Sequence, residues 1–201
     1  MKIAVIGSAG SLGSRIVAEA LRRGHDVTAL TRTDLDAADA DAVTTAVRGH
    51  DVGIGATRPA PGQEHHAATT TRSLLQGHAA AGVRFVMIGG AGALRTPDTG
   101  ELVADDRRWV PQQIAALARS AVDQLDECRM ATGTDWTYVA PSAVMEPGQR
   151  TGHYRTGVDK LLVDEGGNSY VSMEDMAVAV VDELADPSFR GQRFTVATAT
   201  N

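Results

Sequence analysis

Residues 1–13, MKIAVIGSAGSLG, decide the fold. The apolar run before Gly7 predicts a buried strand, and the segment after Gly10 predicts an amphipathic helix that ends at Gly24. In this G-x-x-G-x-x-G spacing, Gly7 permits a sharp turn and Gly10 lets a pyrophosphate approach the backbone. Gly13 permits close packing of the helix on the strand. Because the N-terminus of that helix offers free N–H groups to phosphates, the stretch predicts nucleotide binding.

The rest of the chain alternates strand-like and helix-like segments. This alternation predicts an α/β fold, a Rossmann-like doubly wound parallel sheet. We expect one domain over residues 1–201 with a small C-terminal extension, in which residues 141–175 contribute the substrate-side loops. The expected strands are 2–6, 26–30, 52–56, 83–88, 136–140 and 193–197, and the expected helices are 11–23, 40–48, 64–81, 111–132 and 173–185.

Two features of the C-terminal part are more specific. Residues 161–163 and 170–172 flank the polar segment DEGGN, which predicts a hairpin. Ser172 is a candidate N-cap for the last helix, with Asp175 three residues later. The stretches 89–109 and 141–160 are irregular and follow predicted strands, where an open α/β sheet holds its ligand.

Composition narrows the class of protein. The net charge of -6 argues against a nucleic-acid surface, and no apolar segment is long enough for a membrane span. The single cysteine, Cys128, excludes an internal disulfide and a cysteine-rich metal site, and its helical setting indicates a buried thiol. We therefore expect a cytoplasmic protein, monomeric or homodimeric, with a small-molecule substrate and no metal.

The residues after the second strand select the cofactor. An acidic side chain there would bind the ribose hydroxyls of NAD, whereas this chain has Thr31-Arg32-Thr33. A guanidinium pairs well with a phosphate, and threonine hydroxyls add hydrogen bonds. The sequence thus favours NADP (NADPH). Asp34 keeps NAD as the alternative, if its carboxylate reaches the ribose.

Five motifs together resemble a known family, the atypical short-chain dehydrogenases/reductases, in particular NAD(P)H-binding proteins of the NADH-flavin reductase and NmrA-like type. The resemblance covers essentially the whole chain. It departs from the family in one place, because the usual third strand is missing after Thr33 and that edge of the sheet must be shortened. The motifs are AVIGSAGSLG (4–13), GVRFVMIGGAG (82–92), DWTYVAPS (135–142), GQRTGHYR (148–155) and SMEDMAVA (172–179).

The resemblance extends the expected cofactor site. It implies that the turn after the strand 52–56 runs beneath the ribose of the nicotinamide half. It also implies that the ends of later strands line the substrate cleft. Arg58 is a candidate contact for a phosphate or a substrate anion. The cofactor-binding residues that we expect are Gly7, Ser8, Ala9, Gly10, Ser11, Leu12, Gly13, Thr31, Arg32, Thr33, Leu35, Ala56, Thr57, Arg58, Gly89, Pro141 and Ser142.

A recognisable catalytic set is missing. Classical members of the superfamily use Tyr-x-x-x-Lys to move a proton. None of the three tyrosines here precedes a lysine by four residues, and the expected serine zone after Ile88 is GGAG. The candidates for acid or base are Tyr154, His153, Lys160 and Ser142. Three functions stay open: NADPH-dependent hydride transfer to a flavin, quinone or enone; an epimerase, dehydratase or tailoring reductase; and a non-catalytic dinucleotide-sensing regulator.

Overall fold

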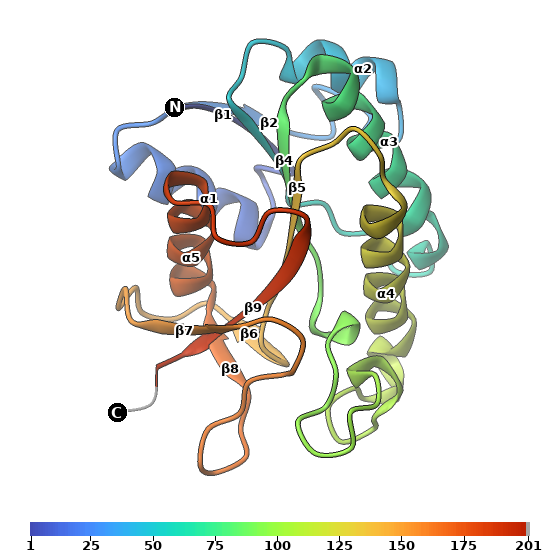
Figure 1. Ribbon diagram of the computed structural model, residues 1–201, viewed down its shortest axis with the longest axis vertical. Helices are drawn as coiled ribbons and strands as arrows, with labels where there is room; N and C mark the ends of the chain where they lie inside the picture. The colour runs from blue at the N-terminus through green and yellow to red at the C-terminus, as the bar shows by residue number, and fades with distance from the viewer. Residues whose placement is uncertain (200–201) are drawn as a thin grey trace.

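The computed structural model describes residues 1–199, and a seven-stranded sheet runs through its centre (Figure 1). The strand order is β2-β1-β3-β4-β5-β9-β7, and every neighbouring pair is parallel except β9 and β7. The predicted doubly wound α/β fold is therefore confirmed. The strands are β1 (Lys2–Ile6), β2 (Asp26–Leu30), β3 (Val52–Gly55), β4 (Arg84–Ile88), β5 (Trp136–Ala140), β7 (Tyr154–Gly157) and β9 (Gln192–Thr198).

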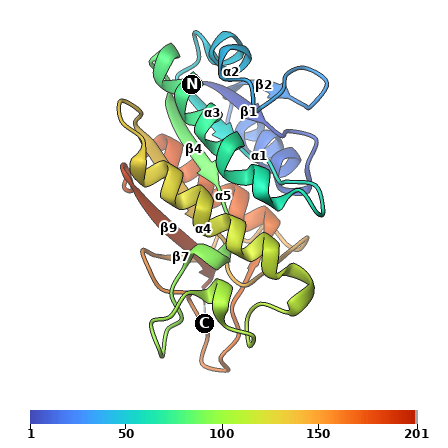
Figure 2. The same cartoon turned by 90° about the vertical axis from the view of Figure 1, so that its right-hand side faces the viewer.

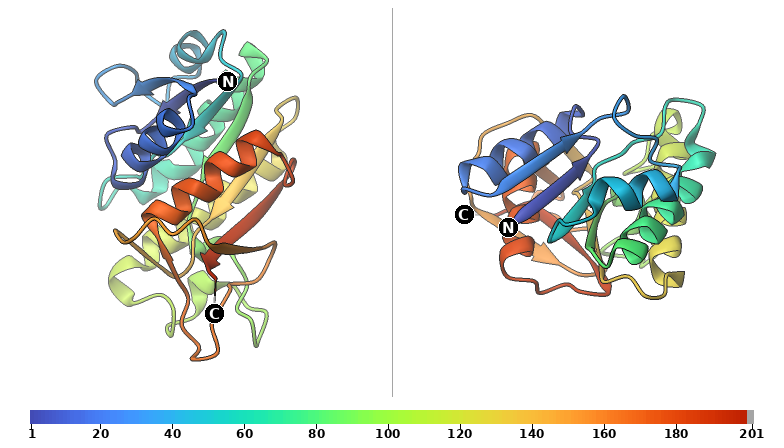
Figure 3. Two further views of the ribbon diagram at one scale, coloured as in Figure 1. Left: turned by 90° about the vertical axis from the view of Figure 1, so that its left-hand side faces the viewer. Right: turned by 90° about the horizontal axis from the view of Figure 1, so that it is seen from above.

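Helices cover both faces of this sheet. Figure 2 shows α2 (Ala40–Val47), α3 (Ala67–Ala81) and α4 (Ala115–Met130) on one side, and Figure 3 shows α1 (Ser11–Arg22) and α5 (Met173–Ala185) on the other. Successive strand residues point to opposite faces. Ala4 and Ile6 accordingly join the core under α2–α4, whereas Ile3 and Val5 join the core under α1 and α5.

Most predicted elements lie within one or two residues of their observed bounds, and two begin with a 3-10 turn. Glu64–His66 precedes α3, and Gln112–Ile114 precedes α4. The predicted cap of α5 is confirmed, since the Ser172 hydroxyl accepts the Asp175 N–H at 3.0 Å. β2 is an edge strand, so no further strand pairs beyond it, and the sheet lacks the extra strand at the edge where the sequence indicated a shortening.

The predicted hairpin is wrong. Residues 161–163 form no strand, and β8 (Tyr170–Ser172) instead pairs in parallel with β6 (Val144–Glu146). Residues 141–160 were expected to be irregular, yet they contain β6 and the antiparallel edge strand β7. The DEGGN segment does turn, through Asp164 and Asn168, but it does not join two paired strands.

Strand β3 is shaped to receive a buried histidine. A Cβ at Gly53 would lie 1.9 Å from Nε2 of His78, which packs from α3. Nδ1 of His78 donates to the Leu74 carbonyl at 2.7 Å, and its ring lies 4.4 Å from that of Phe85. Burial lowers the pKa of His78 to about 4. The imidazole is therefore a neutral part of the core, on the strand that ends at the candidate site.

Candidate functional site

The glycine loop between β1 and α1 has the geometry that its spacing predicts. Gly7 has φ +91°, and a Cβ there would lie 2.4 Å from the Ala56 carbonyl oxygen. A Cβ at Gly13 would lie 2.2 Å from the Gly7 carbonyl oxygen, so the helix could not approach the loop. Gly10 is different, because its missing Cβ has no atom closer than 3.2 Å and faces a cavity. The loop thus leaves open the space that a phosphate group would fill.

The first turn of α1 strengthens this cradle. Gly10 is the N-cap residue and supplies no side-chain hydrogen bond, and the first turn holds no acidic residue. The helix N-terminus therefore keeps N–H groups and a partial positive charge for an external anion. Ser8 links the loop to the end of β2, since its hydroxyl donates to the Leu30 carbonyl at 3.0 Å.

A cavity of about 1200 Å³ opens beside this loop. It lies at the carboxyl ends of β1, β2 and β3, where β1 and β3 are neighbours but their connections lead to opposite sides of the sheet. This switch point is where open α/β sheets bind ligands. Nine of the expected cofactor residues line the cavity: Gly7, Ala9, Gly10, Thr31, Arg32, Leu35, Ala56, Thr57 and Arg58.

The cavity has unpaired positive charge. Neither Arg32 nor Arg58 makes a side-chain hydrogen bond or an ion pair with any residue among 1–199, although most arginines in that range do. Both guanidinium groups remain available for an anionic ligand. Asp36 and Glu64 are the carboxylates in the lining.

Asp34 is held within its own turn. Its Oδ2 accepts both the backbone N–H and the hydroxyl of Thr31, each at 2.7 Å, and Thr31 also contacts the Thr33 hydroxyl at 2.7 Å. The Thr31 hydroxyl and amide lower the pKa of Asp34 by stabilising its carboxylate. Asp34 is absent from the cavity lining, whereas Arg32 is present. The turn therefore brings Arg32 to the cavity lining, whereas the Asp34 carboxylate is engaged by Thr31 within the turn.

Eight expected cofactor residues do not line the cavity: Ser8, Ser11, Leu12, Gly13, Thr33, Gly89, Pro141 and Ser142. Gly89 has a packing role, since a Cβ there would lie 1.9 Å from the Tyr138 hydroxyl. That hydroxyl donates to the Ala121 carbonyl at 2.9 Å and accepts the Gly90 N–H at 3.2 Å. Burial raises the pKa of Tyr138, so its phenol stays protonated inside the core.

The four candidates for acid or base are dispersed and lie outside the cavity lining. Ser142 is 2 % exposed, and its hydroxyl donates to the Val196 carbonyl at 2.9 Å. Tyr154 donates to Asp182 of α5 at 2.5 Å, and burial, followed by this carboxylate, raises its pKa. Lys160 lies on the surface, with Nζ 3.5 Å from the Pro97 carbonyl oxygen. His153 is exposed. Tyr154 and Lys160 thus contact different elements.

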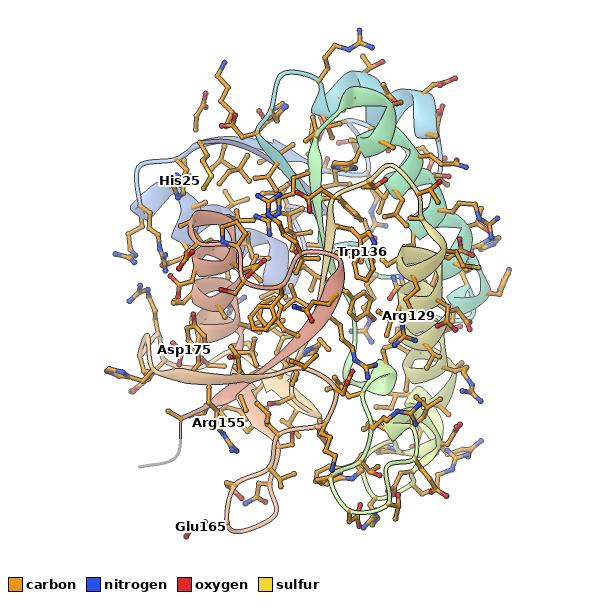
Figure 4. All side chains as sticks on the ribbon, in the orientation of Figure 1. His25, Arg129, Trp136, Arg155, Glu165 and Asp175 are labelled. Atoms are coloured by element: carbon orange, nitrogen blue, oxygen red, sulfur yellow. The ribbon has the colours of Figure 1, made fainter. Side chains whose placement is uncertain are left out.

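The GQRTGHYR motif is explained by its attachment to the helices. Asp175, labelled at the foot of α5 in Figure 4, accepts the backbone N–H groups of Thr151 and Gly152, both at 2.8 Å, and the Thr151 hydroxyl at 2.6 Å. Arg150 pairs with Glu19 of α1 at 2.8 Å. The motif therefore fastens the segment before β7 across α1 and α5, on the face of the sheet opposite α3 and α4.

Several residues that line the cavity were missed by the sequence reasoning. They come from the end of β1, from the loops after β2 and β3, from the start of α3, and from the turn before α4 and one side of that helix. Helical periodicity predicted both helices, but it did not show which polar positions face a cavity. These residues are Ile6, Asp36, Ala37, Ala38, Pro59, Ala60, Pro61, Gln63, Glu64, His66, Ala67, Thr70, Gln113, Ile114, Leu117 and Gln124.

Residues 1–199 contain neither a grouped set of metal ligands nor a helix that could span a membrane. No three histidine, cysteine, aspartate or glutamate side chains in this range are grouped to hold a metal ion. The rings of His65 and His66 lie 4.0 Å apart, without a third partner of that kind. No helix in the same range is both long enough and apolar enough to cross a membrane.

Comparison with known proteins identifies the family. Residues 30–187 match the model of the NAD(P)H-binding family. The chain is 34 % identical over 208 residues to the uncharacterised protein YwnB of Bacillus subtilis, with 98 % of each chain covered. A proposed exported protein from Burkholderia pseudomallei has 38 % identity and a TM-score of 0.89, covering 98 % of this chain and 99 % of that one.

Two further solved structures extend the comparison. A proposed epimerase from Bacteroides thetaiotaomicron has 34 % identity and a TM-score of 0.90, with coverage of 100 % and 98 %. A proposed NADH-flavin reductase from Streptococcus pneumoniae has 29 % identity and a TM-score of 0.87, with coverage of 99 % and 100 %. With a glycine cradle and a cavity at the switch point of the sheet, the chain belongs to the NAD(P)H-binding family.

Proposed function

We propose that this protein is an NADPH-dependent oxidoreductase that transfers hydride to a small organic acceptor of the flavin, quinone or enone type. The observation that carries the proposal is Arg32, an exposed residue of the cavity lining whose side chain has no partner among residues 1–199, beside a turn that keeps the Asp34 carboxylate occupied. An arginine so placed suits the 2′-phosphate of NADPH, and an engaged carboxylate offers little to the ribose hydroxyls of NADH.

The residues of the cavity suit a dinucleotide. The open space at Gly10 and the uncapped start of α1 would receive the pyrophosphate, and Arg58 adds a second cation. Bound NADPH would supply the hydride. The protein would hold the nicotinamide and the acceptor together and exclude water from the space between them.

The dispersed acid and base candidates agree with an acceptor that needs little proton transfer from the protein. A flavin, quinone or enone delocalises the charge that hydride adds, so water can protonate the product. The Tyr154 phenol has a raised pKa and contacts Asp182 rather than the cavity lining. A cytoplasmic location stays a prediction, and one structural relative is a proposed exported protein.

The test is cofactor selectivity. We expect NADPH to bind more tightly than NADH, and Arg32→Ala to weaken NADPH by about 1.5–3 kcal/mol through loss of a charge-assisted contact, with little effect on NADH. Isothermal titration calorimetry measures both affinities. Arg48→Ala is the matched control, because Arg48 is exposed and lies outside the cavity lining. Equal affinities of the wild-type protein for the two cofactors would refute NADPH selectivity.

The same preparation tests turnover. We expect NADPH oxidation with at least one member of a panel of flavins, quinones and enones. Cofactor binding without oxidation by any of them would favour the sensing function instead.

A further inference from the structure

The connection between β2 and α2, near the top of Figure 2, carries three aspartates, and one of them lines the cavity. Thr31 engages the Asp34 carboxylate, and Asp39 caps α2 by accepting two of its first N–H groups at 2.9 and 3.1 Å. Asp36 is the residue of the lining. Its Oδ1 accepts the Ala38 N–H at 2.9 Å, and its Oδ2 has no partner in the part of the chain that the structure describes. One carboxylate oxygen is therefore available to a ligand.

The turn around Asp36 is held on both sides. Leu35 and Ala37 pack against the core under α2–α4. The carbonyl of Ala38 accepts the hydroxyl of Ser73 on α3 at 2.8 Å, which ties the turn to that helix. Because the Ala38 N–H also fixes Oδ1, the carboxylate keeps one orientation. A group that is ordered before a ligand arrives loses little conformational freedom on binding.

Arg32 determines which part of a ligand lies beside Asp36. This step rests on the proposed function, in which Arg32 binds the 2′-phosphate of NADPH. The phosphate and the base are attached to adjacent carbons of one ribose, so the base lies next to the phosphate. Residues 35–38 follow Arg32 directly along the cavity lining, at the end of β2. The group that reaches Oδ2 of Asp36 is thus the base of the cofactor.

We propose that Asp36 accepts a hydrogen bond from the exocyclic amino group of adenine and thereby selects the base of the cofactor. An ionised carboxylate only accepts hydrogen bonds, so beside a phosphate it needs a donor from the ligand. The amino group supplies that donor, and a hydrogen bond to a charged acceptor is stronger than a neutral one. Hypoxanthine has a carbonyl oxygen at the same position, which would set two acceptors against each other. Arg32 and Asp36 would then recognise the phosphate and the base from one turn.

The experiment compares two dinucleotides that differ only at this position of the base. NADPH and its hypoxanthine analogue, in which a carbonyl replaces the amino group, are titrated into the full chain by isothermal titration calorimetry. We expect the wild-type protein to bind the analogue about tenfold more weakly, because the carboxylate loses its donor and faces an acceptor.

Asp36→Asn is the decisive variant. The carboxamide keeps the shape of the side chain and an oxygen for the Ala38 N–H, so the turn should be retained. It accepts from an amino group through its oxygen and donates to a carbonyl through its nitrogen. The affinities for NADPH and for the analogue should therefore come within about twofold of each other. Asp41→Asn is the matched control, since Asp41 is exposed and lies outside the cavity lining, and it should keep the wild-type ratio.

Gln124 provides the competing variant. It lines the cavity, is 6 % exposed and has no hydrogen-bond partner for its amide among residues 1–199. It lies on α4, and α3 separates α4 from α2 (Figure 2). Gln124→Leu should accordingly keep the preference for NADPH over the hypoxanthine analogue.

Three results would overturn the proposal: equal binding of the two dinucleotides by the wild-type protein, an unchanged ratio in Asp36→Asn, or a ratio lost in Gln124→Leu. The last result would place the base between α3 and α4. Failure of the proposed function has a different signature, because NADPH and NADH would then bind equally or NADPH would remain unoxidised. Failure of the base selection alone leaves the preference for NADPH over NADH intact.

Discussion

The buried imidazole of His78 predicts a loss of stability in mild acid. Its Nε2 has no hydrogen-bond partner within the described chain, and its Nδ1 already donates to Leu74. Protonation would place a charge against Gly53 of β3, where a Cβ would lie 1.9 Å from Nε2. His78→Gln removes the titration, so the pH dependence of the two proteins should differ.

The magnitude follows from the two pKa values. Burial lowers the folded-state pKa of His78 from 6.5 to about 4. Between these values the unfolded chain binds a proton that the folded protein does not, so stability falls as pH decreases through 6.5. The loss from this group is about 2 kcal/mol at pH 5 and approaches about 3 kcal/mol below pH 4. Above the unfolded-state pKa of 6.5 neither the folded nor the unfolded chain binds this proton, so His78 causes no loss of stability there.

Urea unfolding at pH 8, 7, 6 and 5 measures the effect. The free energy of unfolding of the wild-type protein should fall more steeply toward pH 5 than that of His78→Gln, whatever the difference between them at pH 8. His65→Gln is the control, because His65 is exposed and its loss should leave the slope unchanged. Parallel pH profiles for the wild-type protein and His78→Gln would refute the buried, neutral imidazole.

Three other predictions concern the site and the thiol. Gly10→Val should leave the protein folded, as judged by circular dichroism, and abolish cofactor binding in calorimetry, because the side chain fills the phosphate space; Gly10→Ala should weaken binding less. Tyr154→Phe and His153→Ala should each lower single-turnover NADPH oxidation less than about tenfold, whereas loss of a positioned acid costs 10²–10⁴-fold; a thousandfold loss with intact cofactor affinity would contradict this. Burial raises the pKa of Cys128 to about 12, so the native protein should not react with a thiol reagent at pH 8 until urea unfolds it.

Local sequence was sufficient for the elements whose signals are local. The glycine spacing at 7, 10 and 13 predicted the turn, the cradle and the close helix packing, because each requirement concerns backbone within a few residues. Ser172 and Asp175 predicted the cap of α5 for the same reason. Continuous apolar runs predicted the central parallel strands, since a strand covered on both faces needs apolar residues at every position.

The pairing of distant segments was decided only by the tertiary structure. β6 and β8 form a parallel pair between residues far apart in sequence, and β7 is a polar edge strand whose Tyr154 is held by Asp182. Neither arrangement is visible in local periodicity, so the sequence around the DEGGN segment predicts a hairpin that the fold does not form. Edge strands and short pairs depend on which surfaces the rest of the fold leaves free.

The candidate site likewise has one part that the sequence predicts and another part that only the structure shows. Sequence alone determined the phosphate cradle and the arginine after β2, because strand ends and helix starts carry those residues wherever a doubly wound sheet forms. The part of the cavity lining that comes from α3 and α4 needed the structure, since an amide such as Gln124 is polar on any helix and only the packing of α3 against α4 makes it a buried residue of the lining. Local sequence thus predicted the glycine loop, whereas the packing of the helices decided which side chains complete the cavity lining.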